Sequence, residues 1–235
     1  MTSFIIGLSF LSSDTQKKVG RRKHLSAEAR RILSLLEDKP LRDNDIKQDE
    51  NGRPYFTGRQ ADFSISHSGD IAAVSLVTGE RLRTGCDIEL VKPRANIREI
   101  ADTFFSAVEK DYIFSMNNLH DIEKNFFTIW TLKECYLKLR GLSVFDMRNV
   151  PSFIYGKSHD GRHFIFDTAD SPLKSFYVYE LKNASGEIYL LSVVIEGDKD
   201  LRPEIRWFSQ PLLPVRSIVE IKAALNPTDT VKPKM

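Results

Sequence analysis

Alternation of apolar and polar residues predicts strands in the first third of the chain. Phe4 to Leu11 is a short apolar run and is expected to form a strand. Period-two alternation over residues 63–67 and again over 71–77, with Ser68-Gly69-Asp70 between them, predicts a β-hairpin. Gly85 to Val91 alternates in the same way and is expected to form a further strand.

Apolar residues spaced three and four positions apart predict helices. The first is expected to start at Ser26, a suitable N-cap that follows a basic linker. The others are expected to cover residues 97–116 and 122–140. Strand patterns then return near residues 153–157, 162–167, 175–182 and 187–196.

Each half of the chain therefore contains a helical pattern accompanied by strands, which favours an α+β fold with two similar lobes. A chain of 235 residues is long enough for two such units. We expect an N-terminal lobe over residues 1–84, a C-terminal lobe over 85–197 and a proline-interrupted, partly flexible extension over 198–235. Ligand clefts commonly form between lobes, and Asp87 stands beside this junction.

Composition excludes several classes of protein. With 41% hydrophobic and 28% charged residues the chain is expected to be soluble and globular. No apolar run approaches the roughly 20 residues of a membrane span, and Phe4 to Leu11 lacks the preceding basic residues of a secretory signal. Only Cys86 and Cys135 are present, so we expect no disulfide framework and a reducing, cytoplasmic location.

Positive charge is concentrated in one stretch, although the net charge is only +2. Between residues 17 and 31 Glu28 is the only acidic residue among seven lysines and arginines. This stretch is either an anion-binding face or a solvated helix flank. A nucleic-acid-binding module would rest on this cluster alone and would bind DNA or RNA in a strongly salt-dependent way.

Two carboxylates share one face of the strand that starts at Gly85. Side chains alternate along a strand, so Asp87 and Glu89 lie on the same side, about 7 Å apart. The pair could simply form the wet face of a strand. It could also bind a hard cation such as Mg²⁺, which commonly bridges substrate phosphates.

The helix over residues 122–140 adds charge next to an apolar face. Lys133 falls in the middle of that face, so it either extends to the edge or reaches an anion in a cleft. Glu134 and Lys138 are one turn apart and could merely stabilise the helix. Together with Asp87 and Glu89, however, they suit a metal-bound polyphosphate.

Two sequence blocks resemble a known family. GCDIE at 85–89 and WTLKECYLK at 130–138 are similar to the signature blocks of the surfactin-type 4′-phosphopantetheinyl transferases, in the same order and at a similar separation. Shorter blocks agree: Gly52-Arg53-Pro54, Ser66-His67, and Phe104-Phe105-Ser106 followed by Glu109. The resemblance covers roughly residues 50–145. Cys86 and Cys135 depart from the family's usual residues but are small enough to leave the site undisturbed.

This resemblance implies a fold and an activity. The fold would be pseudo-dimeric, with two α/β lobes in a monomer and the active site at their interface. The enzyme would transfer the 4′-phosphopantetheine group of coenzyme A to a serine of an acyl or peptidyl carrier protein, with Mg²⁺ as cofactor, and release adenosine 3′,5′-bisphosphate. The carrier would present an acidic helix beside that serine.

The resemblance also implies roles for individual residues at the metal and the phosphates. Asp87, Glu89 and Glu134 would bind Mg²⁺. Lys133 and Lys138 would face the phosphates, with Lys138 also acting in catalysis. Glu109 would take the proton from the carrier serine, although its spacing from Ser106 equally fits a helix-capping box.

The remaining implied roles concern the nucleotide. Ser66 and His67 would hold the 3′-phosphate end, although His67 could instead be an ordinary hairpin residue. The other nucleotide-binding residues, along the adenine and in the basic stretch, would be Gly52, Arg53, Pro54, Arg21, Arg22 and Lys23. A non-catalytic protein that binds coenzyme A or a carrier is the main alternative. His159 and His163 have metal-like spacing, but the turn between them favours a hairpin.

Overall fold

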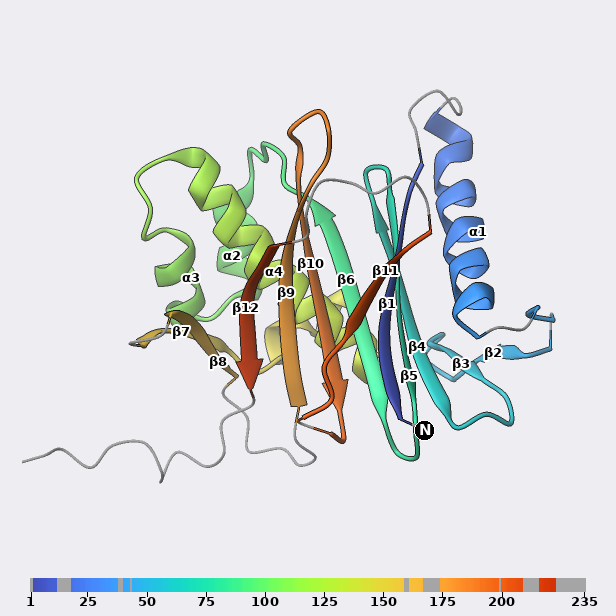
Figure 1. Ribbon diagram of the computed structural model, residues 1–235. Coiled ribbons are helices and arrows are strands. Elements are labelled where there is room, and N and C mark those ends of the chain that lie inside the picture. Colours follow the sequence, from blue (N-terminus) through green and yellow to red (C-terminus); the bar gives the residue numbers. More distant parts are fainter. Residues whose placement is uncertain are drawn as a thin grey trace, which may run out of the picture.

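Two four-stranded sheets pack against each other in the computed structural model, with helices on their outer sides (Figure 1). The first sheet has the order β11 (Glu204–Trp207), β1 (Ser3–Phe10), β5 (Ile71–Thr78) and β4 (Ala61–Ser68). The second has the order β12 (Arg216–Lys222), β9 (Lys174–Lys182), β10 (Ile188–Glu196) and β6 (Arg83–Leu90). The structure describes residues 2–11, 18–37, 40–42, 44–158, 161–166, 174–198, 200–208 and 216–222.

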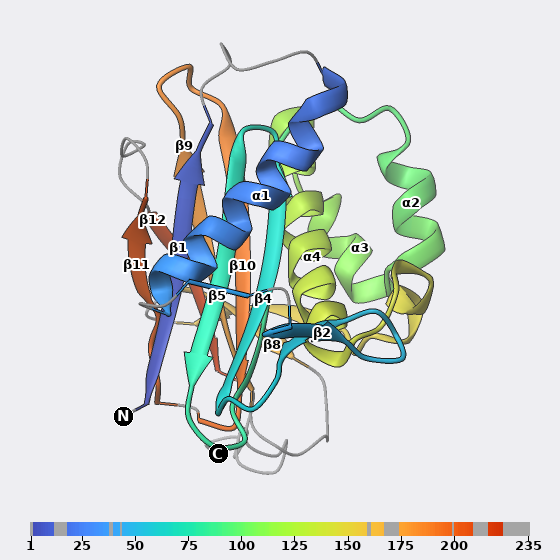
Figure 2. The same ribbon diagram turned by 90° about the vertical axis from the view of Figure 1, so that its right-hand side faces the viewer.

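Each sheet is covered by a helix of its own, and these two helices lie on different sides of the strands in the perpendicular view (Figure 2). Helix α1 (Lys18–Leu36) packs on the first sheet, and α4 (Leu119–Arg140) packs on the second. The smaller elements are α2 (Ile97–Phe104), α3 (Ala107–Ile113), the 3₁₀ helix η1 (Val144–Asn149) and the two-stranded sheets β2 (Ile46–Gln48) with β3 (Pro54–Phe56) and β7 (Phe153–Ser158) with β8 (Gly161–Phe166).

The alternation of side chains along each strand divides the apolar interior into layers. In β1, Ile6 packs in the core between the two sheets, whereas its neighbour Ile5 packs in the core beneath α1. A further core lies between α4 and the outer face of β9 and β10. The order of layers is therefore helix, sheet, sheet and helices, which confirms the predicted α+β class.

The predicted hairpin and the strand carrying the carboxylates are both confirmed. β4 and β5 pair in antiparallel register around Gly69, whose φ of 55° is a left-handed conformation that glycine readily adopts. β6 starts two residues before the predicted Gly85 and pairs with β10. The proposed lobe boundary at residues 84 and 85 falls inside β6, and the division into lobes remains a prediction.

Two helix predictions were wrong at their ends. Helix α1 begins at Lys18 instead of Ser26, and the apolar stripe of the helix includes Leu25, which is buried just before the predicted start. The helix expected over residues 97–116 is two helices. Phe105 is extended, with φ −108° and ψ 147°, and Ser106 and Glu109 form a capping box that starts α3.

The C-terminal extension contributes strands that the sequence reading missed. β11 pairs in parallel with β1, and β12 pairs with β9, so the extension adds one strand to each sheet. Residues 223–235, where a mobile tail was expected, lie outside the described residues, as does His159. Among the described residues no helix has the length and apolar character needed to cross a membrane.

Candidate functional site

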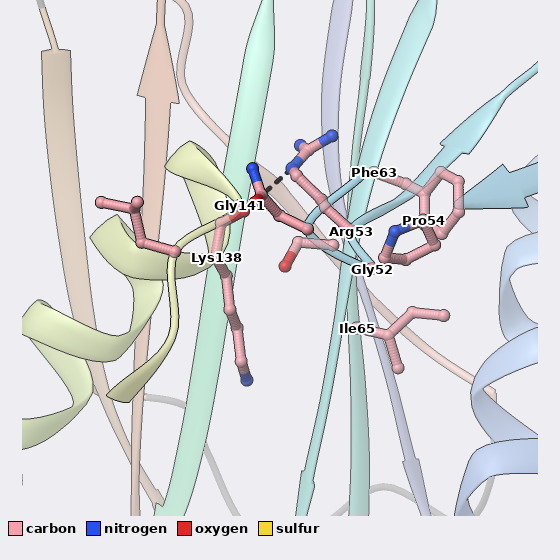
Figure 3. Close-up of a pocket in the computed structure, with 10 residues that line it drawn as sticks. Gly52, Arg53, Pro54, Phe63, Ile65, Lys138 and Gly141 are labelled. Atoms are coloured by element: carbon pink, nitrogen blue, oxygen red, sulfur yellow. Dashed lines mark hydrogen bonds between the residues drawn. The ribbon is translucent and has the colours of Figure 1, made fainter. Parts of the chain in front are cut away.

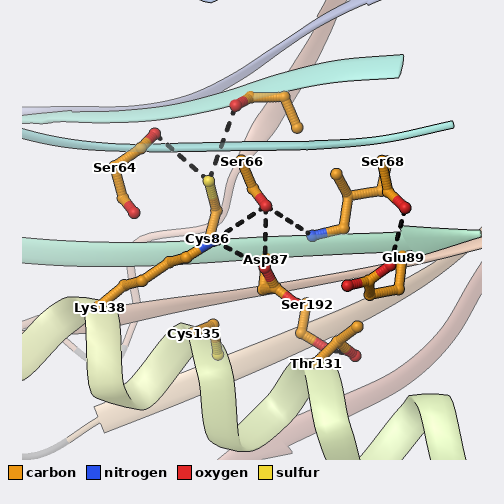
Figure 4. Close-up of polar contacts among 12 residues, drawn as sticks. Ser64, Ser66, Ser68, Cys86, Asp87, Glu89, Thr131, Cys135, Lys138 and Ser192 are labelled. Carbon is orange, nitrogen blue, oxygen red and sulfur yellow. Dashed lines mark hydrogen bonds and ion pairs between the residues drawn. The ribbon is translucent and has the colours of Figure 1, made fainter. Parts of the chain in front are cut away.

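The edge strands of the two sheets, β4 and β6, are joined by side chains. Three β4 side chains accept hydrogen bonds from β6 amides: Asp62 from Thr84, Ser66 from Ile88 and Ser68 from Leu90, at 2.9, 3.3 and 3.1 Å. Each pair is separated by the same 22 residues, so the strands run side by side in a fixed register. This register places the β6 carboxylates beside the serines of β4 (Figure 4).

Asp87 lies at the centre of this seam. Its Oδ1 accepts hydrogen bonds from Ser66 Oγ at 2.8 Å and Lys138 Nζ at 2.7 Å. The same ammonium lies 2.9 Å from Ser66 Oγ, closing a triangle of polar contacts. Asp87 Oδ2 is buried and has no hydrogen-bond partner. A buried carboxylate oxygen left in this state is costly unless a ligand or ion completes it.

Glu89 and Glu134 flank Asp87. Glu89 accepts a hydrogen bond from Ser68 Oγ at 2.7 Å, yet burial raises the pKa of its carboxyl above the usual value, and the negative charge of Asp87 adds to the rise. Burial raises the pKa of Glu134 to about 7, again with repulsion from Asp87. The three carboxylates therefore share one poorly solvated space.

This donor set fits a hard divalent cation. Three carboxylates supply oxygen ligands, two of them have raised pKa values, and Asp87 offers an oxygen with no other partner. Among the described residues no group of three or more His, Cys, Asp or Glu side chains is already arranged to hold a metal ion. The positive charge at Asp87 is instead that of Lys138, so ion binding would require the carboxylates to converge further.

A pocket of about 250 Å³ has Lys138 in its lining (Figure 3). It is lined by the loop before β3, by β4 and by the C-terminal end of α4, including Gly52, Arg53, Pro54, Phe63, Ile65 and Lys138. Lys138 belongs to both places, because its side chain lines the pocket and its ammonium contacts Asp87. The structure thus brings the predicted Gly52-Arg53-Pro54 turn and the predicted lysine to one cavity.

Lys133 and Glu109 lie elsewhere. Their exposed fractions are 1% and 0%, and Lys133 Nζ is 3.2 Å from Glu109 Oε2. Lys133 also donates to the carbonyl of Val150, and Glu109 accepts from the amides of Ser106 and Phe153. Lys133 therefore neither extends to the surface nor reaches a cleft. The expected contact of Lys133 with phosphate and the expected role of Glu109 as a base have no support in this arrangement.

The other predicted nucleotide residues lie on different faces and elements. Ser66 faces Asp87, whereas His67 is on the opposite face of β4, which also carries the pocket-lining residues Phe63 and Ile65. Lys23 is an exposed residue of α1. The side chains of Arg21 and Arg22 lie outside the described residues.

Asp62 and Ser68 were missed by the sequence reading. Both lie on the β4 face that carries Ser66, two or four residues away. The sequence does show a polar residue at every second position of this strand. The prediction of a hairpin did not say which residues those polar side chains would contact.

Gly85 allows α4 to approach β6 closely. A Cβ placed on Gly85 would lie 2.0 Å from the carbonyl oxygen of Cys135, which is backbone and cannot move aside cheaply. The Gly85→Ala variant is therefore expected to push α4, with Glu134 and Lys138, away from Asp87. We expect a loss of stability of about 2 kcal/mol or more, measured by urea unfolding.

Gly7→Ala is the matched control for Gly85→Ala. Its Cβ would lie 2.4 Å from Ile32 Cγ2, at the contact of β1 with α1. This variant is also expected to lose stability, but it should leave ligand binding at the carboxylates unchanged. Equal losses of ligand binding in both variants would contradict the positional role given to Gly85.

Comparison with known proteins relates nearly half of this chain to one family. Residues 83–194, from β6 to β10, match the family model described as 4′-phosphopantetheinyl transferase superfamily. The chain carries a domain of the 4′-phosphopantetheinyl transferase superfamily. The matched segment contains four of the predicted site residues: Asp87, Glu89, Glu134 and Lys138.

Individual 4′-phosphopantetheinyl transferases are also similar to this chain. The chain is 36% identical over 104 residues to the 4′-phosphopantetheinyl transferase AcpT of Escherichia coli (strain K12), covering 44% of this chain and 52% of AcpT. It is 30% identical over 171 residues to the 4′-phosphopantetheinyl transferase pptA of Paxillus involutus, covering 61% and 64% of the two chains. The match to AcpT thus spans about half the length of that relative. The surfactin-type subgroup remains a prediction.

Proposed function

We propose that this protein transfers the 4′-phosphopantetheine group of coenzyme A to a serine of an acyl or peptidyl carrier protein and releases adenosine 3′,5′-bisphosphate. The observation that supports this most directly is the position of Lys138, which joins a pocket of about 250 Å³ to a cluster of three carboxylates. That volume is small for a whole cofactor. We therefore assign the nucleotide end of coenzyme A to the pocket and its pyrophosphate to the carboxylates.

Asp87, Glu89 and Glu134 would hold Mg²⁺ in this proposal. When bound, the ion would neutralise the pyrophosphate oxygens as negative charge accumulates on the leaving group. Ser66 donates to Asp87 Oδ1, which leaves Oδ2 for the ion. Ser68 orients Glu89 in the same manner.

Lys138 supplies a second positive charge. Burial disfavours its charged form, but the contact with Asp87 outweighs burial and the pKa of Lys138 is raised. Its ammonium therefore stays protonated and can donate to phosphate oxygens that enter from the pocket. This is electrostatic stabilisation at the position where charge develops.

The carrier protein and the location of the reaction complete the proposal. The carrier would dock through an acidic helix beside its serine, in a monomeric, cytoplasmic enzyme. Glu109 takes no part, because it is enclosed against Lys133 and backbone amides.

The proposed transfer can be measured directly by mass. Incubation with coenzyme A, Mg²⁺ and an apo-carrier protein is expected to add the mass of one phosphopantetheine to the carrier. No gain in mass, with coenzyme A still bound, would instead show a non-catalytic coenzyme A-binding protein. Omission of Mg²⁺ after chelation is the control and is expected to abolish the gain.

Magnesium binding is expected to depend on pH through Glu134. Its folded pKa of about 7 lies above the ordinary 4.5, so the metal-free fold binds more protons than the unfolded chain between these values. The contribution of Glu134 to stability is thus present at low pH and is lost as pH rises towards 7. Conversely, Mg²⁺ requires the ionised carboxylate, so the increase in Tm on adding Mg²⁺ should grow from pH 6 to 8.

Glu134→Gln is the matched variant for this pH dependence. Glutamine keeps the shape of the side chain but does not titrate. We expect it to flatten the dependence of metal-free stability on pH in this range and to reduce the Mg²⁺-induced rise in Tm. An unchanged pH profile would exclude Glu134 as its source.

A further inference from the structure

Arg53 lines the pocket, but its guanidinium is bound by the protein itself. Its side chain is 8% exposed, and Nη2 lies 2.6 Å from Asp62 Oδ2. Nε donates to the carbonyl of Lys138 at 2.9 Å, a contact visible in Figure 3, and Nη2 also lies 3.2 Å from the carbonyl of Thr84. These contacts use the planar fork of donors that distinguishes arginine from lysine.

The contact with Lys138 satisfies the C-terminal end of α4. The last four carbonyls of a helix have no partner within it, and a cation near them also interacts favourably with the helix dipole. The carbonyl of Lys138 is one of these, and its other contact, from the amide of Gly141, is longer at 3.3 Å. Arg53 is therefore a capping residue supplied to α4 from a loop far away in the sequence.

The remaining contacts hold β6. Thr84 lies three residues before Asp87, and its amide donates to Asp62 Oδ2 at 2.9 Å while its carbonyl accepts from Arg53. Arg53 and Asp62 together thus fix the start of β6 relative to the end of α4. These are the two elements that carry Asp87 and Lys138, whose side chains meet at 2.7 Å.

We infer that Arg53 is a positioning residue that sets the Lys138–Asp87 contact through the backbone, and that its guanidinium does not bind the nucleotide phosphates. The inference rests on the proposed function for its effect on catalysis. It differs from the expected contact of the Arg53 side chain with the nucleotide, because Nε and Nη2 of the guanidinium already donate to Asp62 and to two backbone carbonyls.

Four variants test the inference: Arg53→Lys, Arg53→Met, Asp62→Asn and the double variant Arg53→Met/Asp62→Asn. The double variant leaves no unpaired buried charge. It can therefore be expected to fold, and to be assayed, even if Arg53→Met alone does not fold. Arg59→Met is the matched control, because Arg59 also binds two carboxylates, those of Glu37 and Asp45, but none of the groups at the carboxylate cluster.

We expect each of the four variants to lower kcat for phosphopantetheine transfer by about 10- to 100-fold, since a misplacement of about 1 Å has that effect. KM for coenzyme A and the Kd of adenosine 3′,5′-bisphosphate, measured by calorimetry, should change less than about threefold. Lysine should not rescue kcat, and the double variant should be no worse than the worst single variant. Arg59→Met should leave kcat, KM and Kd unchanged. A rise in Kd with unchanged kcat in Arg53→Met, together with an unaffected Asp62→Asn, would overturn the inference.

A second measurement separates this inference from the proposed function. If the wild-type protein transfers nothing, the proposed function fails, and the coupling of Arg53→Met with Asp87→Asn in urea unfolding still tests the positioning role. Arg53 acts on Asp87 only through the intervening backbone, so the combined loss of stability is expected to be smaller than the sum of the separate losses. Strict additivity would show that the two residues are independent and would refute the inference.

Discussion

Replacement of Asp87 by asparagine is expected to lower phosphopantetheine transfer by roughly 10³-fold or more, because loss of a metal-centred interaction worth about 4 kcal/mol corresponds to that factor. Asparagine keeps an oxygen that can accept from Ser66 and Lys138, so the fold should persist. It removes the charge that the ion would need. The rate is measured by the mass of the carrier, and retention of the fold by circular dichroism.

An independent readout accompanies this variant. The Mg²⁺-induced rise in Tm should disappear in Asp87→Asn, whether or not the carrier substrate is available. Asp111→Asn is the control, because Asp111 is an exposed residue of α3. A variant at Asp87 that keeps a third of the wild-type rate would exclude this residue as an essential metal ligand.

Replacement of Lys133 by methionine is expected to destabilise the protein by about 3 kcal/mol or more, since it leaves the carboxylate of Glu109 buried without its cation. Burial disfavours the charged form of Lys133 and lowers its pKa, while the negative charge of Glu109 opposes that shift. Urea unfolding measures the loss. The double variant Lys133→Met/Glu109→Gln, which removes both charges, should recover most of it.

The same pair of variants distinguishes a structural ion pair from a catalytic one. If Lys133 and Glu109 only connect α3, α4 and the start of β7, the double variant should keep most of the wild-type kcat once folded. A stable Lys133→Met protein that has lost transfer would contradict this view. It would indicate that the roles implied by resemblance to the family are correct and that Lys133 turns towards substrate.

The carboxylate cluster could be predicted because each member follows from a local repeat. Asp87 and Glu89 share a face through the two-residue repeat of a strand, and Glu134 and Lys138 share one through the turn of a helix. Such repeats give a direction for each side chain. The family-like blocks then related the strand to the helix, and the structure places their charged groups together.

Lys133 shows why direction was not sufficient. The spacing placed it correctly on an apolar face but could not give the depth at which its ammonium lies. Its partner Glu109 was also recognised, as a capping residue of α3. The ion pair depends on how α3 packs against α4, and that packing has no local signature in the sequence.

Long-range pairing similarly explains why β11 was missed. β11 is only four residues long and alternates between exposed and half-buried positions, so its composition alone gives little indication of a strand. Its backbone donors and acceptors pair with β1, roughly two hundred residues earlier in the chain. Pairing of this kind is decided by the assembled sheet and not by the four residues.

The pairing of β1 with β11 also constrains the order in which the molecule can form. Because Ile5 to Leu8 pair with Glu204 to Trp207, the first sheet cannot be completed on the ribosome until nearly the whole described chain has emerged. Until then β1 presents an open edge that another nascent chain could occupy. A recombinant fragment ending with the matched segment at residue 194 would keep the carboxylates but would leave that edge permanently unpaired, and association between chains is the expected result.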